Sequence, residues 1–196
     1  REERGRLKFI VLLILGLGNP GPRYELTRHN AGFLVLENLA DKYKIKLSQS
    51  KYRSLYGKGE INGLPVILAK PMTYMNESGK AVKALISAFN LSLEQILVIH
   101  DDIDLPLGKI KTKLKGGDGG QLGIRSTIET LQTREFFRLR LGVGRPEHRE
   151  DIVDYVLSPF SEEELGLLNE VMDKAVHTIE AALKELNKKR NNPTEE

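Results

Sequence analysis

The sequence predicts an α/β fold: a single domain with a mixed, mostly parallel, twisted sheet and helices on both faces. Three apolar runs have the length of strands, and a polar cluster directly follows each of them. Segments with helical spacing of apolar residues separate these runs. At 196 residues the chain is long enough for one sizeable core. We expect this domain to cover residues 1–190, followed by a polar tail over 191–196.

The first apolar run covers Phe9 to Leu15 and is typical of a strand buried on both faces. Glycines and prolines crowd residues 16–22, which predicts a tight loop at the carboxyl end of this strand. Ligands bind at such strand ends in open α/β sheets. Asn30 can then cap a helix over residues 31–43.

A hairpin is predicted next, with residues 54–60 paired to residues 64–69 through an Asn62-Gly63 turn. A helix is expected over residues 78–90, because its apolar residues recur with helical spacing. The third buried strand of the prediction covers residues 96–99.

Residues 109–114 and 137–143 alternate between apolar and polar side chains, which favours two further strands. The loop between them, residues 115–123, is rich in glycine, so its backbone can approach a ligand closely. The simpler interpretation is a plain flexible connector. A short helix is expected over residues 122–132.

Ser161 and Glu164 have the spacing of a capping box and predict the start of a long final helix. Its apolar residues recur every three or four positions. Residues 188–196 are polar, and we expect them to fray.

The three apolar runs end in the polar clusters GLGN (16–19), MTYMN (72–76) and HDD (100–102). If the three strands are parallel, their carboxyl ends lie along one edge of the sheet. We therefore expect the clusters to converge on one site.

The charge of the chain is unevenly distributed. The net charge is +3. Residues 105–145 contain nine basic residues against three acidic ones and carry +6, so the rest of the chain carries −3. The basic residues are Lys109, Lys111, Lys113, Lys115, Arg125, Arg134, Arg138, Arg140 and Arg145. A basic half favours a polyanionic partner, although such a run is often only a solvated face.

The amino-acid composition indicates in which cellular compartment the protein acts. The chain has no cysteine, which excludes disulfides and thiolate sites and is compatible with a reducing compartment. The basic residues before Phe9 resemble a signal peptide, but no small-residue cleavage site follows. The apolar run is also shorter than the roughly 20 residues needed to span a membrane. We expect a cytoplasmic protein that makes no contact with membranes.

Gly16, Gly18 and Gly21 match the G-x-G-x-x-G pattern of dinucleotide-binding folds. That pattern requires a helix to open at its last glycine, so that the helix N-terminus faces the pyrophosphate. Pro22 follows instead, and the helical periodicity begins only near Phe33. We therefore expect no nucleotide cofactor.

His29 is a candidate general base, because the pKa of histidine lies near neutrality. Asp101 or Asp102 can accept a hydrogen bond from its ring and fix the tautomer. No serine or cysteine has the context of a nucleophile, so we expect water to attack. The rival interpretation is a magnesium site at Asp101, Asp102 and Asp104. We consider it weaker, because the other strand ends supply asparagines and a methionine rather than carboxylates.

The sequence resembles a known family, the bacterial-type peptidyl-tRNA hydrolases. The resemblance covers almost the whole chain and is carried by several long motifs in the same order. These are GLGNPGPRYELTRHNAGF (16–33), KPMTYMNESGKAV (70–82), HDDIDLPLGKIKTKLKGG (100–117), RLRLGVGRP (138–146) and DYVLSPF (154–160).

The resemblance implies hydrolysis of the ester between a peptide and the terminal ribose of tRNA, without metal or cofactor. It implies that His29 is the catalytic base and Asp101 its partner. Further implied contacts are Asn19 and Asn76 as substrate-holding amides, Tyr24 and Met75 in the peptide groove, and Lys113 and Arg140 near the tRNA. The expected partners are peptidyl-tRNA and tRNA, and the expected state is a monomer.

The sequence departs from the family in the glycine loop. The family usually reads G-G-H-N-G there, with a His and an Asn that contact substrate or the reactive water. Here the same place reads Gly119-Gly120-Gln121-Leu122-Gly123, and Leu122 can donate no side-chain hydrogen bond. Hydrolase activity is expected to be low unless Gln121 takes over the contact that Leu122 cannot make. The alternative is an RNA-binding factor of the same fold with weak or no hydrolase activity.

Overall fold

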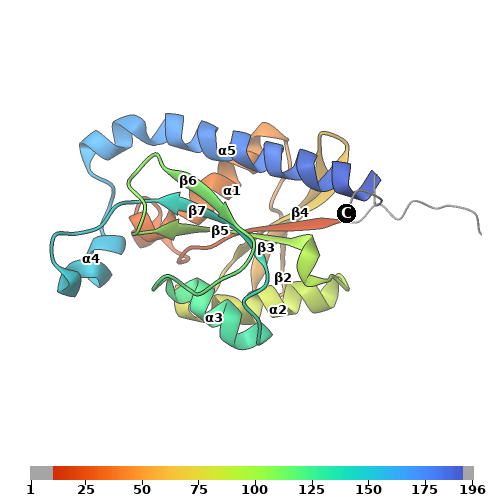
Figure 1. The fold of residues 1–196 in the computed structure, drawn as a ribbon, viewed down its shortest axis with the longest axis horizontal. Helices are drawn as coiled ribbons and strands as arrows, with labels where there is room; N and C mark the ends of the chain where they lie inside the picture. Colours follow the sequence, from red (N-terminus) through yellow and green to blue (C-terminus); the bar gives the residue numbers. More distant parts are fainter. Residues whose placement is uncertain (1–10, 192–196) are drawn as a thin grey trace, which may run out of the picture.

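The computed structural model describes residues 11–191 and shows one sheet between two layers of helices (Figure 1). The seven strands are ordered β2-β3-β4-β1-β5-β7-β6 across the sheet. Their bounds are β1 Leu12–Gly16, β2 Gln49–Lys51, β3 Ser54–Ile61, β4 Leu64–Pro71, β5 Ile96–Asp102, β6 Ile110–Lys113 and β7 Phe137–Gly142.

The middle of the sheet is parallel: β4, β1, β5 and β7 all run in one direction. β3 and β6 run antiparallel to β4 and β7. β2 is antiparallel to β3 and so points with the central strands. Five of the seven strands therefore share one direction, and the predicted mixed, mostly parallel sheet is confirmed.

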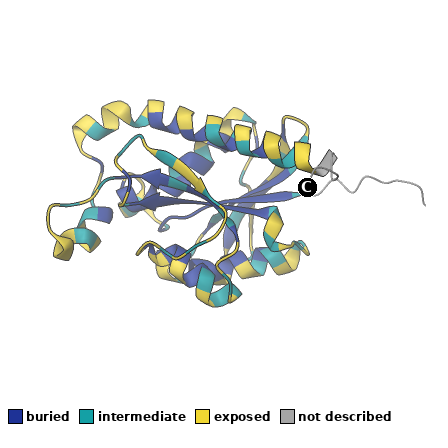
Figure 2. Ribbon diagram, viewed as in Figure 1, coloured by how far each residue is buried: buried dark blue, intermediate teal, exposed yellow. Residues whose placement is uncertain are grey.

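Helices cover both faces of the sheet, as predicted. α1 and α5 pack on one face and α2 and α3 on the other, with a separate apolar cluster under each layer. Figure 2 shows the central strands buried between the two layers. The short helix α4 lies beyond the carboxyl ends of the central strands (Figure 1). The helix bounds are α1 Ala31–Lys42, α2 Ser78–Ala88, α3 Leu122–Leu131, α4 Ile152–Val156 and α5 Glu162–Asn191.

Five single turns of 3₁₀ helix join these elements. They are η1 Pro22–Tyr24, η2 Arg28–Asn30, η3 Met75–Glu77, η4 Leu93–Gln95 and η5 Arg149–Asp151. η1, η2 and η3 all follow the carboxyl ends of β1 or β4, so they add short rigid turns to the region where the clusters were expected to meet. Across residues 11–191, no helix combines the length and the apolar character needed to cross a membrane.

Two glycines let the start of α1 touch the end of β1. A Cβ on Gly32 would lie 2.5 Å from the carbonyl oxygens of both Leu17 and Ile99. A Cβ on Gly16 would lie 2.3 Å from the carbonyl oxygen of Gly32. Side chains at these positions would push α1 away from the sheet. The contact brings η2, and His29 with it, close to the ends of β1 and β5.

The predicted hairpin is confirmed as β3 and β4. Asn62 and Gly63 have φ angles of 50° and 82°, the left-handed conformations that a two-residue hairpin turn favours. β2 was not predicted. Its three residues are polar and exposed, so they show none of the apolar alternation that identifies a strand.

The limits of other elements differ from the prediction. β1 begins at Leu12, and Phe9 lies outside the described residues. β5 continues to Asp102, so the HDD cluster is part of the strand rather than of the loop after it. α5 continues to Asn191, so fraying from residue 188 is wrong, while residues 192–196 lie outside the described part.

Two capping predictions had different outcomes. Ser161 Oγ accepts from the Glu164 backbone N–H at 3.1 Å, and Glu164 Oε1 accepts from the Ser161 N–H at 2.8 Å. This capping box is confirmed. Asn30 occupies the N-cap position of α1, but its side chain makes no capping bond. That prediction is wrong, because the amide of Asn30 bonds to the backbone of Asn19 instead.

The glycine contact predicts the effect of one substitution. Gly32→Ala should lower the free energy of unfolding by about 2–4 kcal/mol, since the added methyl meets backbone atoms that cannot rotate away. Urea unfolding followed by circular dichroism would measure this.

The matched control is Gly166→Ala, also within a helix. A Cβ at Gly166 meets nothing within 4 Å, so this change should raise the free energy of unfolding by about 0.5–1 kcal/mol. Equal effects of the two substitutions would show that the contact at Gly32 is not tight.

Candidate active site

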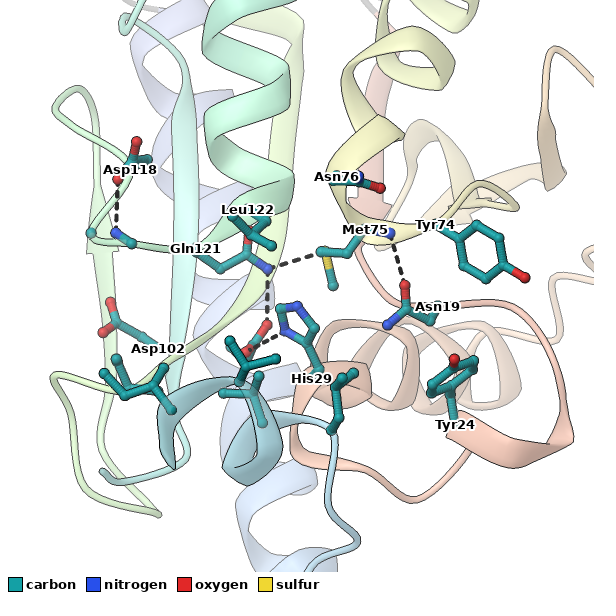
Figure 3. Close-up of a pocket in the computed structure, with 18 residues that line it drawn as sticks. Asn19, Tyr24, His29, Tyr74, Met75, Asn76, Asp102, Asp118, Gln121 and Leu122 are labelled. Carbon is teal, nitrogen blue, oxygen red and sulfur yellow. Dashed lines mark hydrogen bonds and ion pairs between the residues drawn. The ribbon is translucent and has the colours of Figure 1, made fainter. Parts of the chain in front are cut away.

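The three polar clusters meet around one cavity of about 290 Å³. Asn19 follows β1, Met75 and Asn76 follow β4, and Asp101 and Asp102 end β5. They converge because β4, β1 and β5 are adjacent and parallel, so their carboxyl ends lie side by side. The convergence predicted from the sequence is confirmed (Figure 3).

His29 and Asp101 form a buried hydrogen-bonded pair within this cavity. Nδ1 of His29 lies 2.8 Å from Oδ2 of Asp101, and the two side chains are only 7% and 2% exposed. A proton on Nδ1 leaves the lone pair on Nε2. Nε2 lies on the other side of the ring from Nδ1 and has no hydrogen-bond partner within residues 11–191. The ring is therefore arranged to accept a proton from a molecule in the cavity.

The pKa of His29 is set by two opposing effects. Burial lowers the pKa, because a charged ring is poorly solvated there. The negative charge of Asp101 and its hydrogen bond raise the pKa by more, so it lies above its ordinary value of 6.5. A raised pKa makes the neutral ring a stronger base than an ordinary histidine.

Asn19 is held from two sides. The side chain of Asn30 accepts from the Asn19 N–H at 2.8 Å and donates to the Asn19 carbonyl at 2.9 Å. The Asn19 Oδ1 accepts from the backbone N–H of Met75 at 2.8 Å. This fixes which end of the amide is oxygen, so Nδ2 is left as a donor toward the cavity (Figure 3). This role of Asn30 was not predicted, because its only signal in the sequence is its position beside His29.

The glycine loop forms another wall of the cavity, through residues 118–122. Gly119 and Gly120 have φ angles of 58° and 79°, which glycine adopts without strain. Asp118 stabilises the turn: its Oδ1 accepts from the Gly120 N–H at 2.7 Å, and its Oδ2 accepts from Arg125 at 3.0 Å. The backbone of this loop can therefore approach a ligand in the cavity closely, as predicted.

Gln121 is buried in this wall and contacts Asp101 directly. Its Nε2 lies 3.0 Å from Oδ1 of Asp101 and 3.2 Å from the sulfur of Met75. Its Oε1 accepts from the backbone N–H of Ile124 at 2.7 Å. The adjacent Leu122 is 42% exposed and lines the cavity.

Helix α4 and the residue after it, Leu157, supply an apolar wall that was not predicted. Ile152, Val153, Val156 and Leu157 line the cavity, and Val153 is 64% exposed. Arg28, next to His29, holds this helix. Its guanidinium donates to the Tyr155 carbonyl at 3.2 Å, lies 4.1 Å from the centre of the Tyr155 ring, and pairs with Glu164 at 2.5 Å.

The carboxylates of the HDDID segment each have a different basic partner. Asp101 contacts His29, Asp102 pairs with Arg140 at 2.7 Å, and Asp104 pairs with Arg145. Among residues 11–191 there is no group of three acidic or histidine side chains placed to hold a metal ion. The donor set therefore does not fit the rival magnesium site.

The remaining predicted residues divide into two groups. Tyr24, Met75, Asn76 and Leu122 line the cavity with Asn19, His29 and Asp101. Lys113 and Arg140 do not line it; they lie on the neighbouring strands β6 and β7.

Arg138, counted among the basic residues that favour a polyanionic partner, is not on the surface, so its expected contribution to a basic face is wrong. It is 2% exposed, and its guanidinium donates to the carbonyls of Gly116, Gly117 and Arg134. It therefore anchors the start of the glycine loop from within the fold.

Comparison with known proteins identifies the family. A family model described as peptidyl-tRNA hydrolase matches residues 13–196. The chain belongs to the peptidyl-tRNA hydrolase family. The peptidyl-tRNA hydrolase of Bacillus subtilis is 48% identical over 173 residues, which cover 88% of this chain and 92% of that protein. That of Shouchella clausii is 47% identical over 171 residues, covering 87% and 92%.

Solved structures of the peptidyl-tRNA hydrolase family have the same fold. The crystal structure of the enzyme from Acinetobacter baumannii matches with a TM-score of 0.85 and 38% identity, over 96% of both chains. The family resemblance of the sequence is thus confirmed, together with the single-domain α/β fold.

The His29–Asp101 contact predicts how the pKa of His29 responds to substitution of Asp101. In a ¹H–¹⁵N NMR titration, His29 should titrate above 6.5. Asp101→Asn should bring its pKa below 6.5, because burial then acts without the opposing charge.

Asp104→Asn is the control for that titration, since Asp104 pairs with Arg145 and does not line the cavity. It should leave the pKa of His29 unchanged. A pKa that stays above 6.5 in Asp101→Asn would contradict this account of the pair.

Proposed function

We propose that this chain hydrolyses the ester bond between peptide and tRNA in peptidyl-tRNA, releasing tRNA for reuse in translation. Membership of the family supports this proposal. The observation that carries it to particular residues is the buried His29–Asp101 pair beside a cavity, with Nε2 on the other side of the ring from Nδ1.

In the proposed reaction, Nε2 of His29 takes a proton from a water molecule, and the hydroxide oxygen attacks the ester carbonyl carbon. Asp101 accepts the hydrogen bond from Nδ1 and stabilises the imidazolium that forms. The bond from the carbonyl carbon to the ribose oxygen then breaks. His29 returns its proton to that oxygen, which yields a free peptide carboxyl group and a ribose hydroxyl. The proposed steps require no metal and no cofactor.

We assign Asn19 to hold the ester, because Oδ1 is already bonded to Met75 and Nδ2 is left to donate. A donor fixed in this way can stabilise negative charge on the carbonyl oxygen as water attacks. Asn76, exposed at the rim of the cavity, is assigned to a polar group of the substrate such as a ribose hydroxyl.

The peptide is assigned to the apolar side of the cavity. Tyr24 and Met75 form part of it, Leu122 another part, and α4 the wall beyond. Such a surface contacts peptide side chains without requiring a particular sequence.

We assign tRNA to the basic surface at β6. Lys109, Lys111 and Lys115 are exposed and Lys113 is partly exposed, and none of them forms an ion pair with another residue of the described part. Arg140 pairs with Asp102 and keeps 24% of its side chain exposed, which places a cation between this surface and the cavity. We further propose that the protein is a monomer and acts in the cytoplasm, where tRNA is used in translation.

Replacing the base should abolish turnover but not binding. His29→Ala should lower kcat at least about 10³-fold, and Asp101→Asn about 10²-fold, because orientation is lost while the ring remains. Release of labelled peptide from peptidyl-tRNA measures turnover, and a filter-binding assay with tRNA measures binding. His177→Ala, whose side chain is 81% exposed on α5, is the control and should match the wild type. Equal loss of binding and turnover in His29→Ala would indicate a structural role.

The lysines of β6 should make tRNA binding depend on salt. Lys111→Ala/Lys113→Ala should lower the slope of log affinity against log salt by roughly one unit per phosphate contact removed. The control is Lys184→Ala/Lys188→Ala on α5. If both double variants keep the wild-type slope, the β6 lysines are only solvated surface.

Leu122 should limit the rate. Leu122→Asn restores an amide where the family has one, and we expect kcat to rise about tenfold with little change in KM, because the contact acts mainly in the transition state. Leu167→Asn, an exposed leucine of α5, is the matched control and should change neither constant. No gain in an active protein would indicate a site rebuilt around Leu122. No activity in either protein would favour the alternative, an RNA-binding factor.

A further inference from the structure

Gln121 makes contacts that a residue in a simple connector would not need. It is 7% exposed and stands at the N-cap position of α3. Its side chain spans from the first turn of that helix, at Ile124, to the carboxylate of Asp101. The sequence marks this position only as a departure from the family.

The orientation of the Gln121 amide follows from its partners. Oε1 faces the backbone N–H of Ile124 at 2.7 Å and must accept. Nε2 faces the carboxylate oxygen Oδ1 of Asp101 at 3.0 Å and must donate. The flipped amide would oppose donor to donor and acceptor to acceptor, so both contacts would become repulsive.

Asp101 therefore accepts one hydrogen bond on each oxygen. His29 occupies Oδ2 and Gln121 occupies Oδ1. Two donors from different segments, η2 and the glycine loop, prevent the carboxylate from rotating about its own axis. A carboxylate held in this way keeps the His29 ring in one orientation and its proton on Nδ1.

We propose that Gln121 is a positioning residue for the His29–Asp101 pair, acting through Asp101 rather than on the substrate. In this chain an amide donor at the N-terminus of α3 locks the carboxylate that orients the base. The kinetic part of this inference rests on the proposed hydrolysis, but the geometry of the pair does not.

Two substitutions separate this role from helix capping. Gln121→Glu keeps an oxygen for Ile124 but replaces the donor to Asp101 with an acceptor. Gln121→Ser keeps a capping side chain that is too short to reach Asp101. Ser126→Ala is the control: its hydroxyl accepts from the Gly79 N–H at 2.9 Å, so the change weakens the attachment of α3 without touching Asp101.

The first measurement is kinetic. Gln121→Ser should lower kcat about 10-fold to 100-fold with KM within about twofold, and Gln121→Glu should lower it at least as much. Ser126→Ala should keep the kcat of the wild type. A fall in kcat no larger than that of Ser126→Ala, or a change in KM alone, would overturn the proposal.

The second measurement needs no substrate. In ¹H NMR, the Nδ1 proton of His29 should give a low-field signal in the wild type and in Ser126→Ala. The signal should be lost to exchange in Gln121→Ser. Gln121→Glu should raise the pKa of His29, because a second carboxylate is added. The other titratable residues that line the cavity are not substituted in these variants. They are Asp102, which pairs with Arg140, Asp118, which pairs with Arg125, and Tyr24 and Tyr74.

The two measurements distinguish failure of this proposal from failure of the proposed function. If the wild type releases no peptide, the hydrolase proposal fails and the NMR signals alone decide the role of Gln121. If Gln121→Ser does not fold, Gln121→Glu decides, since it retains the cap. An unchanged signal and pKa of His29 in folded variants would show that Gln121 serves only α3.

Discussion

The site depends on the parallel pairing of β1 with a strand on each side. Because β4 and β5 flank it in the same direction, the chain leaves the sheet at neighbouring points after Gly16, Pro71 and Asp102. The backbone contact of Gly32 with the carbonyls of Leu17 and Ile99 then brings the following helix down onto these ends. Each later feature uses this arrangement: His29 enters from the turn before α1, and Asp101 is presented by β5 itself.

Within that frame, the carboxylates that line the cavity are already paired inside the protein. Asp102 and Asp118 each have an arginine, and Asp101 has two donors. Among the buried side chains that line the cavity, the polar atoms left without a partner in the described residues are Nε2 of His29 and Nδ2 of Asn19, one acceptor and one donor. Both residues line the cavity, where a bound ligand can complete the hydrogen bonds of these two atoms. An acceptor for a water proton beside a donor for a carbonyl oxygen is the pair of functions that ester hydrolysis requires.

Patterns among residues close together in the sequence predicted most of the fold. They also predicted those parts of the site that depend only on the direction of the strands. Apolar runs identified β1 and β5, and Asn62-Gly63 identified the hairpin turn, since each depends on residues near one another. Contacts between distant segments were not predictable in this way. Asn30 had the chemistry of a cap, yet Asn19, eleven positions earlier, uses its amide. Arg138 alternated like a surface residue but lies beneath a loop whose carbonyls need a donor. The exposed polar strand β2 carried no signal at all.

The position of β6 has a consequence for solubility. This strand ends the sheet, so its outer backbone groups have no neighbour in the described part of the chain and are a template on which another copy could add a strand. Lys111 and Lys113 within it, and Lys109 and Lys115 beside it, place four like charges along that border. A second copy approaching in register would bring its own lysines against these. The same charges that attract a polyanion therefore also protect the protein from edge-to-edge aggregation, and neutralising them would expose it to self-association.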